Sequence, residues 1–302
     1  MSVSAMKKTG KYDRSRRISG IMLTLPALLV MAATVLYPIL WSLKISVFES
    51  EGIMSTGSFV GLENYWTVLN SSQFQKALVN TLGFVSATII VELFIGFVIA
   101  LVLNKSLPGT KFFRVIFTLP LMIAPVVSGL QWRWLFADQY GVVNAVLKLV
   151  GIDGPLWLGT VWGARSAVLI ANVWLATPFV ILILLAAMSS LSEDLYEAAR
   201  LDGANAFQIF RLITLPLLKP AILMILVVRL SDAFRVFDIV YILTQSGPGG
   251  STEVLSTYIY KNTFTGMHFG QGSAASFLVM ILIMIISFVL FRVLRPKEDK
   301  AR

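Results

Sequence analysis

Four charged residues, spaced three apart, interrupt an apolar run in the second half of the chain. They are Arg229, Asp232, Arg235 and Asp238, within the run 220–243. On a helix, residues at this spacing lie along one slowly drifting face, where opposite charges neutralise each other. If the run crosses a membrane, each unpaired ion would cost about 2.5–3.5 kcal/mol, so such charges face a bundle interior or a water-filled cavity. The pattern predicts either a self-neutralised brace against neighbouring helices or a polar wall of a substrate cavity, and one residue can serve both.

A polar wall of this kind suits a ligand that is rich in hydroxyl groups. Arginine and aspartate side chains can hydrogen-bond sugar hydroxyls. Three aromatic residues of the same run, Phe234, Phe237 and Tyr241, can stack on the faces of sugar rings. The two arginines do not indicate an anionic ligand, because the two aspartates balance their charge.

Glu92 is a lone carboxylate near the middle of another apolar run, 77–103. Inside a membrane, a carboxylate is either protonated or paired. Arg229 and Arg235 are the partners at a matching depth. A structural ion pair is therefore predicted, with direct contact to a substrate as the alternative.

The apolar run 166–191 contains Asn172, Trp174 and Thr177 shortly before Pro178. A proline inside a helix frees a backbone carbonyl that neighbouring groups must satisfy. Trp174 either stacks on a sugar ring or packs at an interface. We include Asn172, Trp174 and Thr177 among the candidates for the substrate path.

Residue sets for nucleotide hydrolysis, metal binding and nucleophilic catalysis are missing from the sequence. The chain has no cysteine, a single histidine, His268, and no G-x-x-x-x-G-K-[ST] phosphate loop. We therefore predict no catalytic residue, no metal site and no cofactor bound by this chain, so it is not expected to be an enzyme. If the protein uses ATP and Mg²⁺, a partner must bind and hydrolyse the nucleotide.

A polar segment between two apolar runs is expected at a membrane face. Ser190 and Glu193 have the spacing of a capping box that begins a short helix, and Gly203 can take the left-handed conformation that ends it. The residues that share one side of this helix are Leu195, Ala198, Ala199 and Asp202. The small alanines let another backbone approach closely. Such a segment either lies on lipid headgroups or docks on a partner protein.

The composition is that of a membrane protein. The chain has 302 residues, of which 57% are hydrophobic and 14% charged, and its mean hydropathy is +0.80; soluble domains average about 25% charged residues. A helix needs about 20 apolar residues to cross a bilayer. The sequence predicts six spans: 18–43, 77–103, 115–132, 166–191, 220–243 and 274–291. The first run is longer than the apolar core of a signal peptide, so we expect a retained span.

Lysine and arginine placement predicts the orientation. With the N-terminus inside, the inner segments carry 17 basic residues and the outer segments carry six, which satisfies the positive-inside rule. This places both termini and the segment around Glu197 in the cytoplasm. The net charge of +9 then reflects membrane topology, and no nucleic-acid partner is predicted.

The polar segment follows the pattern EAA-x3-G-x9-I-x-LP from Glu197 to Pro216. It resembles the cytoplasmic coupling loop of permease subunits from binding-protein-dependent ABC importers. In that family, the helix of this loop docks into a cleft on the ATP-hydrolysing subunit. The resemblance implies an ATPase contact through Glu193, Glu197, Ala198, Ala199, Asp202 and Gly203.

Other motifs are similar to those of carbohydrate permeases, including the maltose, trehalose and glycerol-phosphate types. The resemblance implies an all-α membrane protein with six transmembrane helices, the type I ABC importer permease fold. The chain lacks the extra N-terminal spans and the large outer domain of the longer maltose-type subunit. The motifs that carry the resemblance are at 120–127, 132–136, 172–179, 232–238, 241–244 and 247–249.

The resemblance implies a permease for a sugar in the bacterial cytoplasmic membrane. Its expected partners are a second related permease, two ATPase subunits that bind ATP and Mg²⁺, and an extracytoplasmic solute-binding protein. The alternatives are an ABC permease for another solute such as glycerol phosphate, and an ion-coupled carrier that uses Glu92 and Asp232. The expected divisions are a basic tail 1–17, the first span and outer segment 18–74, the transmembrane core 75–291 with its coupling loop 190–219, and a basic tail 292–302.

Overall fold

A computed structural model describes residues 19–50, 52, 57–105 and 108–294. Within these residues the regular structure is helical, apart from an isolated antiparallel bridge between Phe48 and Phe59. The basic tail 1–17 and residues 295–302 of the other basic tail lie outside the described residues. Among the described residues, four helices are long and apolar enough to cross a membrane, and two bent helix pairs raise the possible number of spans to six.

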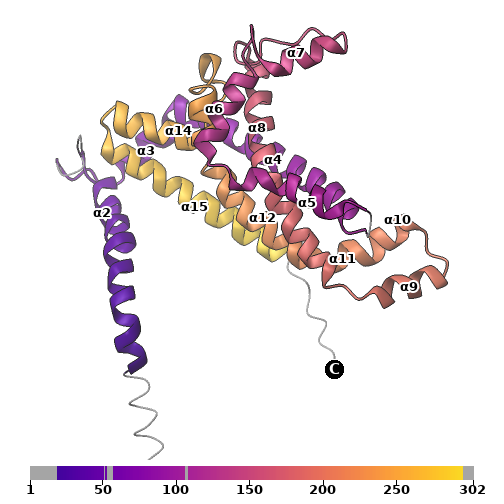
Figure 1. Cartoon of the computed structure of the whole chain (residues 1–302). Coiled ribbons are helices and arrows are strands. Elements are labelled where there is room, and N and C mark those ends of the chain that lie inside the picture. Colours follow the sequence, from indigo (N-terminus) through magenta and orange to yellow (C-terminus); the bar gives the residue numbers. More distant parts are fainter. Residues whose placement is uncertain (1–18, 51, 53–56, 106–107, 295–302) are drawn as a thin grey trace, which may run out of the picture.

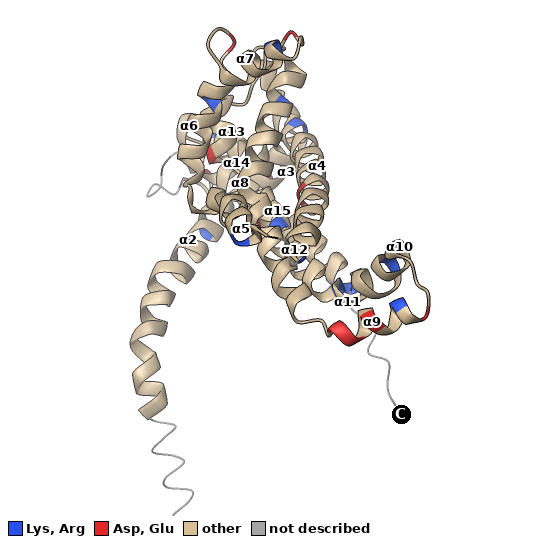
Figure 2. Ribbon diagram, turned by 45° about the vertical axis from the view of Figure 1, so that its right-hand side comes forward, with Lys and Arg blue, Asp and Glu red and all other residues tan. Residues whose placement is uncertain are grey.

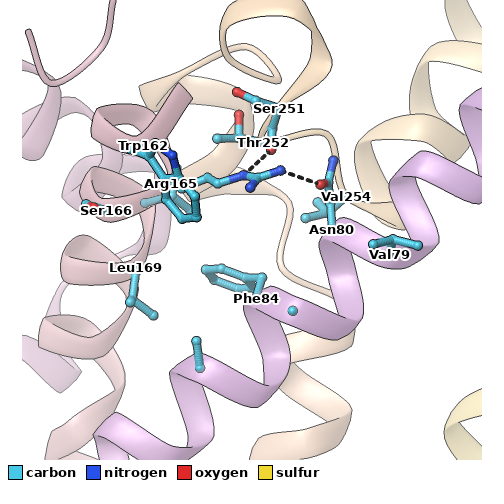
Figure 3. A pocket seen from close by; sticks show the side chains of 13 residues that line it. Val79, Asn80, Phe84, Trp162, Arg165, Ser166, Leu169, Ser251, Thr252 and Val254 are labelled. Atoms are coloured by element: carbon cyan, nitrogen blue, oxygen red, sulfur yellow. Dashed lines mark hydrogen bonds between the residues drawn. The ribbon is translucent and has the colours of Figure 1, made fainter. Parts of the chain in front are cut away.

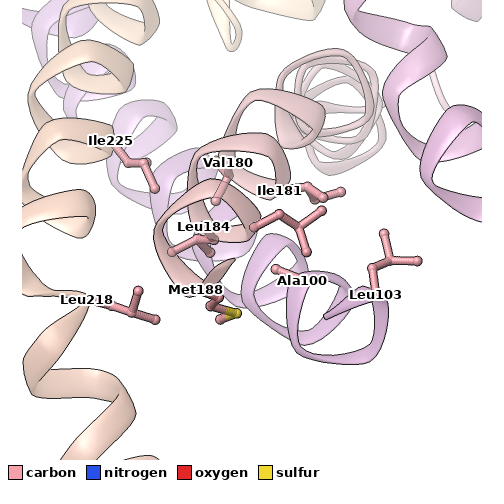
Figure 4. Packing of buried hydrophobic residues seen from close by; sticks show 9 residues of the cluster. Ala100, Leu103, Val180, Ile181, Leu184, Met188, Leu218 and Ile225 are labelled. Carbon is pink, nitrogen blue, oxygen red and sulfur yellow. The ribbon is translucent and has the colours of Figure 1, made fainter. Parts of the chain in front are cut away.

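Three apolar helices, α4, α8 and α12, form the centre of the bundle, and α15 packs against α12 (Figure 1). Their buried side chains are mostly aliphatic, and Figure 4 shows Ala100 from α4, Val180 and Leu184 from α8 and Ile225 from α12 meeting in one cluster. The bounds are α4 Ser72–Leu103, α8 Val161–Ser189, α12 Lys219–Phe234 and α15 Phe269–Leu294. The runs 77–103, 166–191 and 274–291 are therefore confirmed as helices.

The first span stands apart from this bundle. It runs from Ser19 to Ser46 and includes a π-helical turn, η1 (Ala32–Leu36), before α2 (Tyr37–Ser46). Its most apolar window is not buried at all, and Figure 1 shows α2 approaching the other helices only at its upper end, where it contacts α15. The prediction of a helix over 18–43 is confirmed, and its apolar surface is left to contact lipid or another protein.

The run 115–132 is not one straight helix. Two helical pieces meet at a bend of 103°, which corrects the prediction of a single continuous span. Pro125 is the first residue of the second piece, and the preceding residues Ile123 and Ala124 are extended, as residues before a proline tend to be. The pieces are α5 Thr110–Thr118 with the 3-10 turn η2 Leu119–Met122, and then α6 Pro125–Leu135.

The run 220–243 is also interrupted. The helix α12 ends at Phe234, and a new helix, α13 (Asp238–Leu243), begins after three non-helical residues and packs on α6. The expected ladder of four charges on one helical face is therefore wrong in its last member. Arg229 and Asp232 share α12, Arg235 caps it, and Asp238 starts α13.

The polar segment after α8 projects from one end of the bundle (Figure 1). Figure 2 shows that acidic and basic residues gather there, on α9 and on the turn after α10. The elements are α9 Glu193–Leu201, α10 Ala206–Ile209, the π turn η3 Phe210–Thr214 and α11 Leu215–Leu217. A bend of 63° separates Ala206–Leu217 from α12.

The ends of α9 agree with the sequence only in part. Gly203 has φ of +81°, which confirms the left-handed turn that ends the helix. The predicted capping box of Ser190 and Glu193 is wrong. The Ser190 hydroxyl donates to the carbonyl of Ala187, and Ser192 is the N-cap residue. Serine at the end of a helix often bonds back to the preceding turn in this way.

Short helices cover the opposite end of the bundle. The chain turns at Gly61 and Leu62 and then forms α3. The 245–250 segment carries positive φ at several residues and forms only a 3-10 turn, η4. The bounds are α3 Glu63–Asn70, α7 Val142–Leu149, η4 Pro248–Gly250, α14 Leu255–Tyr260 and the π turn η5 Lys261–Thr265.

Gly96 allows α4 and α8 to approach closely. A Cβ atom on Gly96 would lie 2.6 Å from Cγ1 of the buried Val180. We expect Gly96→Ala to lower the stability by about 1–3 kcal/mol, the usual cost of overpacking. Gly83→Ala on the same helix meets nothing within 4 Å and is expected to raise it by about 0.5–1 kcal/mol. Thermal unfolding of the two purified variants tests the packing, and shifts of the same sign would contradict it.

Candidate functional site

A cavity of about 350 Å³ lies where the two interrupted runs meet α8. Residues of the bend before α6 form one side, and residues of the break between α12 and α13 form another. Irregular backbone is tolerated inside a membrane protein where it lines a cavity. Both interruptions of the helices meet this condition. The lining residues are Leu121, Ile123, Pro125, Asn172, Leu175, Ala176, Phe179, Arg229, Asp232, Arg235, Val236, Phe237, Asp238 and Ile239.

A buried ion pair lies at one side of this cavity. The Arg229 guanidinium donates to Glu92 through Nε at 2.8 Å and Nη2 at 3.0 Å, and the Asn172 amide donates to Glu92 Oε1 at 3.3 Å. The side chains of Glu92 and Arg229 are 1% and 10% exposed. Two parallel hydrogen bonds make the pair both strong and directional. The predicted pairing of Glu92 with an arginine is confirmed.

Two more charged side chains, Asp232 and Arg235, extend from this ion pair toward the exposed side of the cavity. Asp232 lies 3.4 Å from Nη1 of Arg229 and 3.2 Å from Nη2 of Arg235, and the Arg235 side chain is 70% exposed. Asp238 lines the cavity but has no ion pair with these groups in the described part of the chain. The geometry thus joins the two expected roles, because Arg229 holds α12 against α4 and also lines the cavity.

Several candidate residues do not line this cavity. Trp174 packs edge to face against Trp132 at a centroid distance of 5.7 Å. The Thr177 hydroxyl donates to the carbonyl of Val173 at 2.6 Å and is buried. Phe234 is 1% exposed and belongs to an apolar cluster with residues of α4. The structure therefore gives these three side chains packing contacts within the bundle.

Aromatic side chains surround the break between α12 and α13. Phe237 stacks on Tyr241 at 5.1 Å, and Tyr260 from α14 contacts Phe237 at 5.0 Å and Tyr241 at 5.4 Å. A second cavity, of about 680 Å³, shares Arg235 and Phe237 with the first. Sequence reasoning did not include Tyr260 or the cavity residue Phe179. Pro178, which adjoins Phe179, is a local signal that this part of α8 lines a cavity. Tyr260 comes from a distant segment, and no local signal in the sequence indicates its position.

The polar helix α9 exposes most of its candidate contact residues. Glu193, Glu197, Ala198 and Asp202 are exposed, and Ala199 is half-buried. The hydroxyls of Tyr196 and Thr214 lie 3.3 Å apart and join α9 to the returning chain. Apolar side chains are exposed beside them, including Leu201 and Phe207. The surface of α9 and the following turn is therefore both acidic and apolar.

Metal binding is not indicated by the described residues. No group of three or more histidine, cysteine, aspartate or glutamate side chains within them is arranged to hold a metal ion. Arg229, Asp232 and Arg235 of the first cavity instead form ion pairs with each other or with Glu92.

Known proteins resemble the chain over nearly its full length. A family model described as "Binding-protein-dependent transport system inner membrane component" matches residues 92–300. The trehalose/maltose transport system permease protein MalF of Thermococcus litoralis is 37% identical over 291 residues, covering 96% of this chain and 98% of that protein. The trehalose transport system permease protein SugA of Mycobacterium tuberculosis is 33% identical, covering 96% and 93%.

A solved structure has the same fold. A chain of the bacterial alginate ABC transporter, in complex with an alginate pentasaccharide-bound periplasmic protein, superposes with a TM-score of 0.82 at 25% identity. The match covers 94% of this chain and 96% of that one. The bent helix pairs and the projecting polar segment thus belong to a known transporter architecture.

Proposed function

We propose that this chain, which belongs to the family of binding-protein-dependent transport system inner membrane components, is the permease subunit of an ABC importer for a sugar. The observation that carries the proposal is the polar, aromatic-edged cavity formed by the two interrupted runs. Relatives named for trehalose, maltose and alginate support the substrate class. The protein acts as a multi-pass component of the bacterial cytoplasmic membrane.

The cavity chemistry suits a sugar. Asp232 and Arg235 are partly exposed and retain hydrogen-bonding capacity for hydroxyl groups. Phe237 adds an aromatic ring to the cavity wall. Opposite charges in close contact leave little net field to favour an ion, which supports a hydroxylated ligand over a strongly charged one. Asn172, Arg229, Asp232, Arg235, Phe237 and Asp238 are the proposed substrate-path residues.

Each bent helix pair counts as one span in this proposal, which gives six transmembrane helices with both termini in the cytoplasm. The distribution of basic residues supports this orientation. The helix α9 then faces the cytoplasm, and Gly203 ends it. The residues of α9 that contact an ATPase subunit there are Glu193, Glu197, Ala198, Ala199 and Asp202. ATP and Mg²⁺ bind in that partner.

Three partner polypeptides and a binding protein complete the proposed cycle. This chain is one of two related permeases. The cavity is open to one side of the chain, so a second permease is needed to enclose a path. Two ATPase subunits drive the change between inward- and outward-facing states, and an extracytoplasmic binding protein delivers the sugar. ATP drives direction because it binds one of the two states more tightly.

The test is transport by the reconstituted complex. We expect proteoliposomes that contain this chain, its partner permease and the ATPase to accumulate a sugar only with ATP and the binding protein. Stimulation of ATPase activity by glycerol phosphate alone would favour the non-sugar alternative. Accumulation by this chain alone from an ion gradient would overturn the proposal in favour of a carrier using Glu92 and Asp232.

Arg235 gives a prediction for the cavity itself. We expect Arg235→Gln to raise the sugar concentration for half-maximal uptake about tenfold, the effect of losing a hydrogen bond from a charged group. Its stability should change little, because the side chain is 70% exposed. Arg133→Gln, at an exposed arginine that does not line the cavity, is the matched control. Equal uptake curves for the two variants would exclude Arg235 from the path.

A further inference from the structure

A separate cavity of about 390 Å³ lies between α4 and α8 (Figure 3), at the end of the bundle opposite α9 (Figure 1). Its walls are largely apolar. Phe84 from α4 and Leu169 from α8 both lie below its rim, and Val79 and Ala87 also line it. None of these residues lines the proposed substrate cavity, so this site is physically distinct from the sugar path.

Arg165 crosses the rim of this cavity. Its Nε donates to the carbonyl of Ser251 at 3.1 Å, and its Nη2 donates to Asn80 Oδ1 at 3.1 Å, as Figure 3 shows. The guanidinium also lies 5.5 Å from the centre of the Trp162 ring. These contacts hold the group in place but use only two of its five N–H donors.

The positive charge of Arg165 has no acidic partner in the part of the chain that the structure describes. Within the described residues no carboxylate lies within ion-pair distance of it, and Glu253 from the adjoining loop is paired with Lys261 at 3.2 Å. A fixed, exposed cation with free donors therefore stands directly above an apolar cavity. This combination is complementary to an amphipathic anion.

We propose that this cavity binds an anionic phospholipid, with its phosphate on Arg165 and an acyl chain between Phe84 and Leu169. Arginine matches phosphate geometry through paired N–H donors, and the apolar walls below it suit an acyl chain. Trp162 is 75% exposed, as expected of a tryptophan at headgroup level. In the orientation proposed above the lipid belongs to the outer leaflet.

Native mass spectrometry of the assembled, delipidated complex tests this site. The probes are phosphatidylglycerol and phosphatidylcholine with identical acyl chains. Arg165→Gln removes the charge. Gly83→Leu adds a large side chain at a residue that lines the cavity, where a Cβ meets nothing within 4 Å. Arg133→Gln removes an exposed arginine that lies outside the cavity and donates to the carbonyl of Ile242.

We expect the native complex and Arg133→Gln to retain one phosphatidylglycerol more tightly than phosphatidylcholine. Arg165→Gln should weaken phosphatidylglycerol binding about tenfold or more, and Gly83→Leu should weaken both lipids. Equal binding by Arg165→Gln and Arg133→Gln would overturn the proposal. So would an assembled complex that binds no phosphatidylglycerol, since another subunit would then cover the cavity. These outcomes concern lipid alone, so they are independent of which solute is transported.

Discussion

Replacing Arg229 with methionine is expected to destabilise the protein by about 3–5 kcal/mol, the cost of leaving one member of a buried ion pair without its partner. Glu92 is 1% exposed and receives two hydrogen bonds from Arg229. After the substitution, only the Asn172 amide remains as its hydrogen-bond donor. A buried carboxylate in that state must be desolvated or protonated, and both cost free energy. The thermal unfolding midpoint of the purified variant measures the loss.

Two further variants separate burial from charge. Arg235→Met removes a similar side chain that pairs with Asp232 at 3.2 Å but is 70% exposed, so it should cost about 0–1 kcal/mol. Adding Glu92→Gln to Arg229→Met removes the orphan charge and keeps an acceptor for Asn172, so most of the stability should return. If Arg229→Met and Arg235→Met lowered the midpoint equally, the buried pair would not be the brace between α4 and α12.

The apolar runs were predictable from the sequence, but their bends were not. Hydropathy and length identified the spans that became α4, α8 and α15 to within a few residues at most ends. Hydropathy is blind to backbone direction, so 115–132 looked continuous although the residues before Pro125 turn the chain by 103°. The break after Phe234 has no proline or glycine to announce it. Contact of α13 with α6 accompanies this break, and tertiary packing of that kind leaves no local signal.

The site was predicted in its buried half. The matching positions of Glu92 and the arginines along their apolar runs were enough to predict the ion pair, because a carboxylate inside a membrane is either protonated or paired. The open half depended on the break at 235–237, which displaced Asp238 from the expected ladder and brought Tyr260 beside Phe237. Spacing along one segment cannot reveal such a contact, since α14 is distant in sequence. The roles of Glu193, Glu197 and the other α9 residues stay a prediction.

Replacing Gly203 with proline is expected to uncouple the importer while leaving the chain in the membrane. Gly203 has φ of +81° and donates its N–H to the Arg200 carbonyl. Proline fixes φ near −65° and has no N–H, so the turn that ends α9 cannot form. If α9 is the ATPase contact, we expect the ATPase subunit to bind the variant at least about thirtyfold more weakly, because loss of an interface hot spot costs about 2 kcal/mol or more. Co-purification of the ATPase and ATP-driven uptake measure this effect.

A graded series distinguishes docking from folding. A Cβ on Gly203 meets nothing within 4 Å, so Gly203→Ala should suffer only the left-handed penalty of about 1–2 kcal/mol, and Gly203→Asn less. Glu197→Lys leaves the turn intact, because Glu197 is exposed and has no ion pair within the described residues. Its effect therefore reports the partner surface alone, with Asp138→Lys at the opposite end as the control. Glu197→Lys changes the charge of α9, and Gly203→Pro changes the shape of its C-terminal turn. Normal ATPase binding by both variants would show that α9 is not the contact that couples ATP hydrolysis to transport.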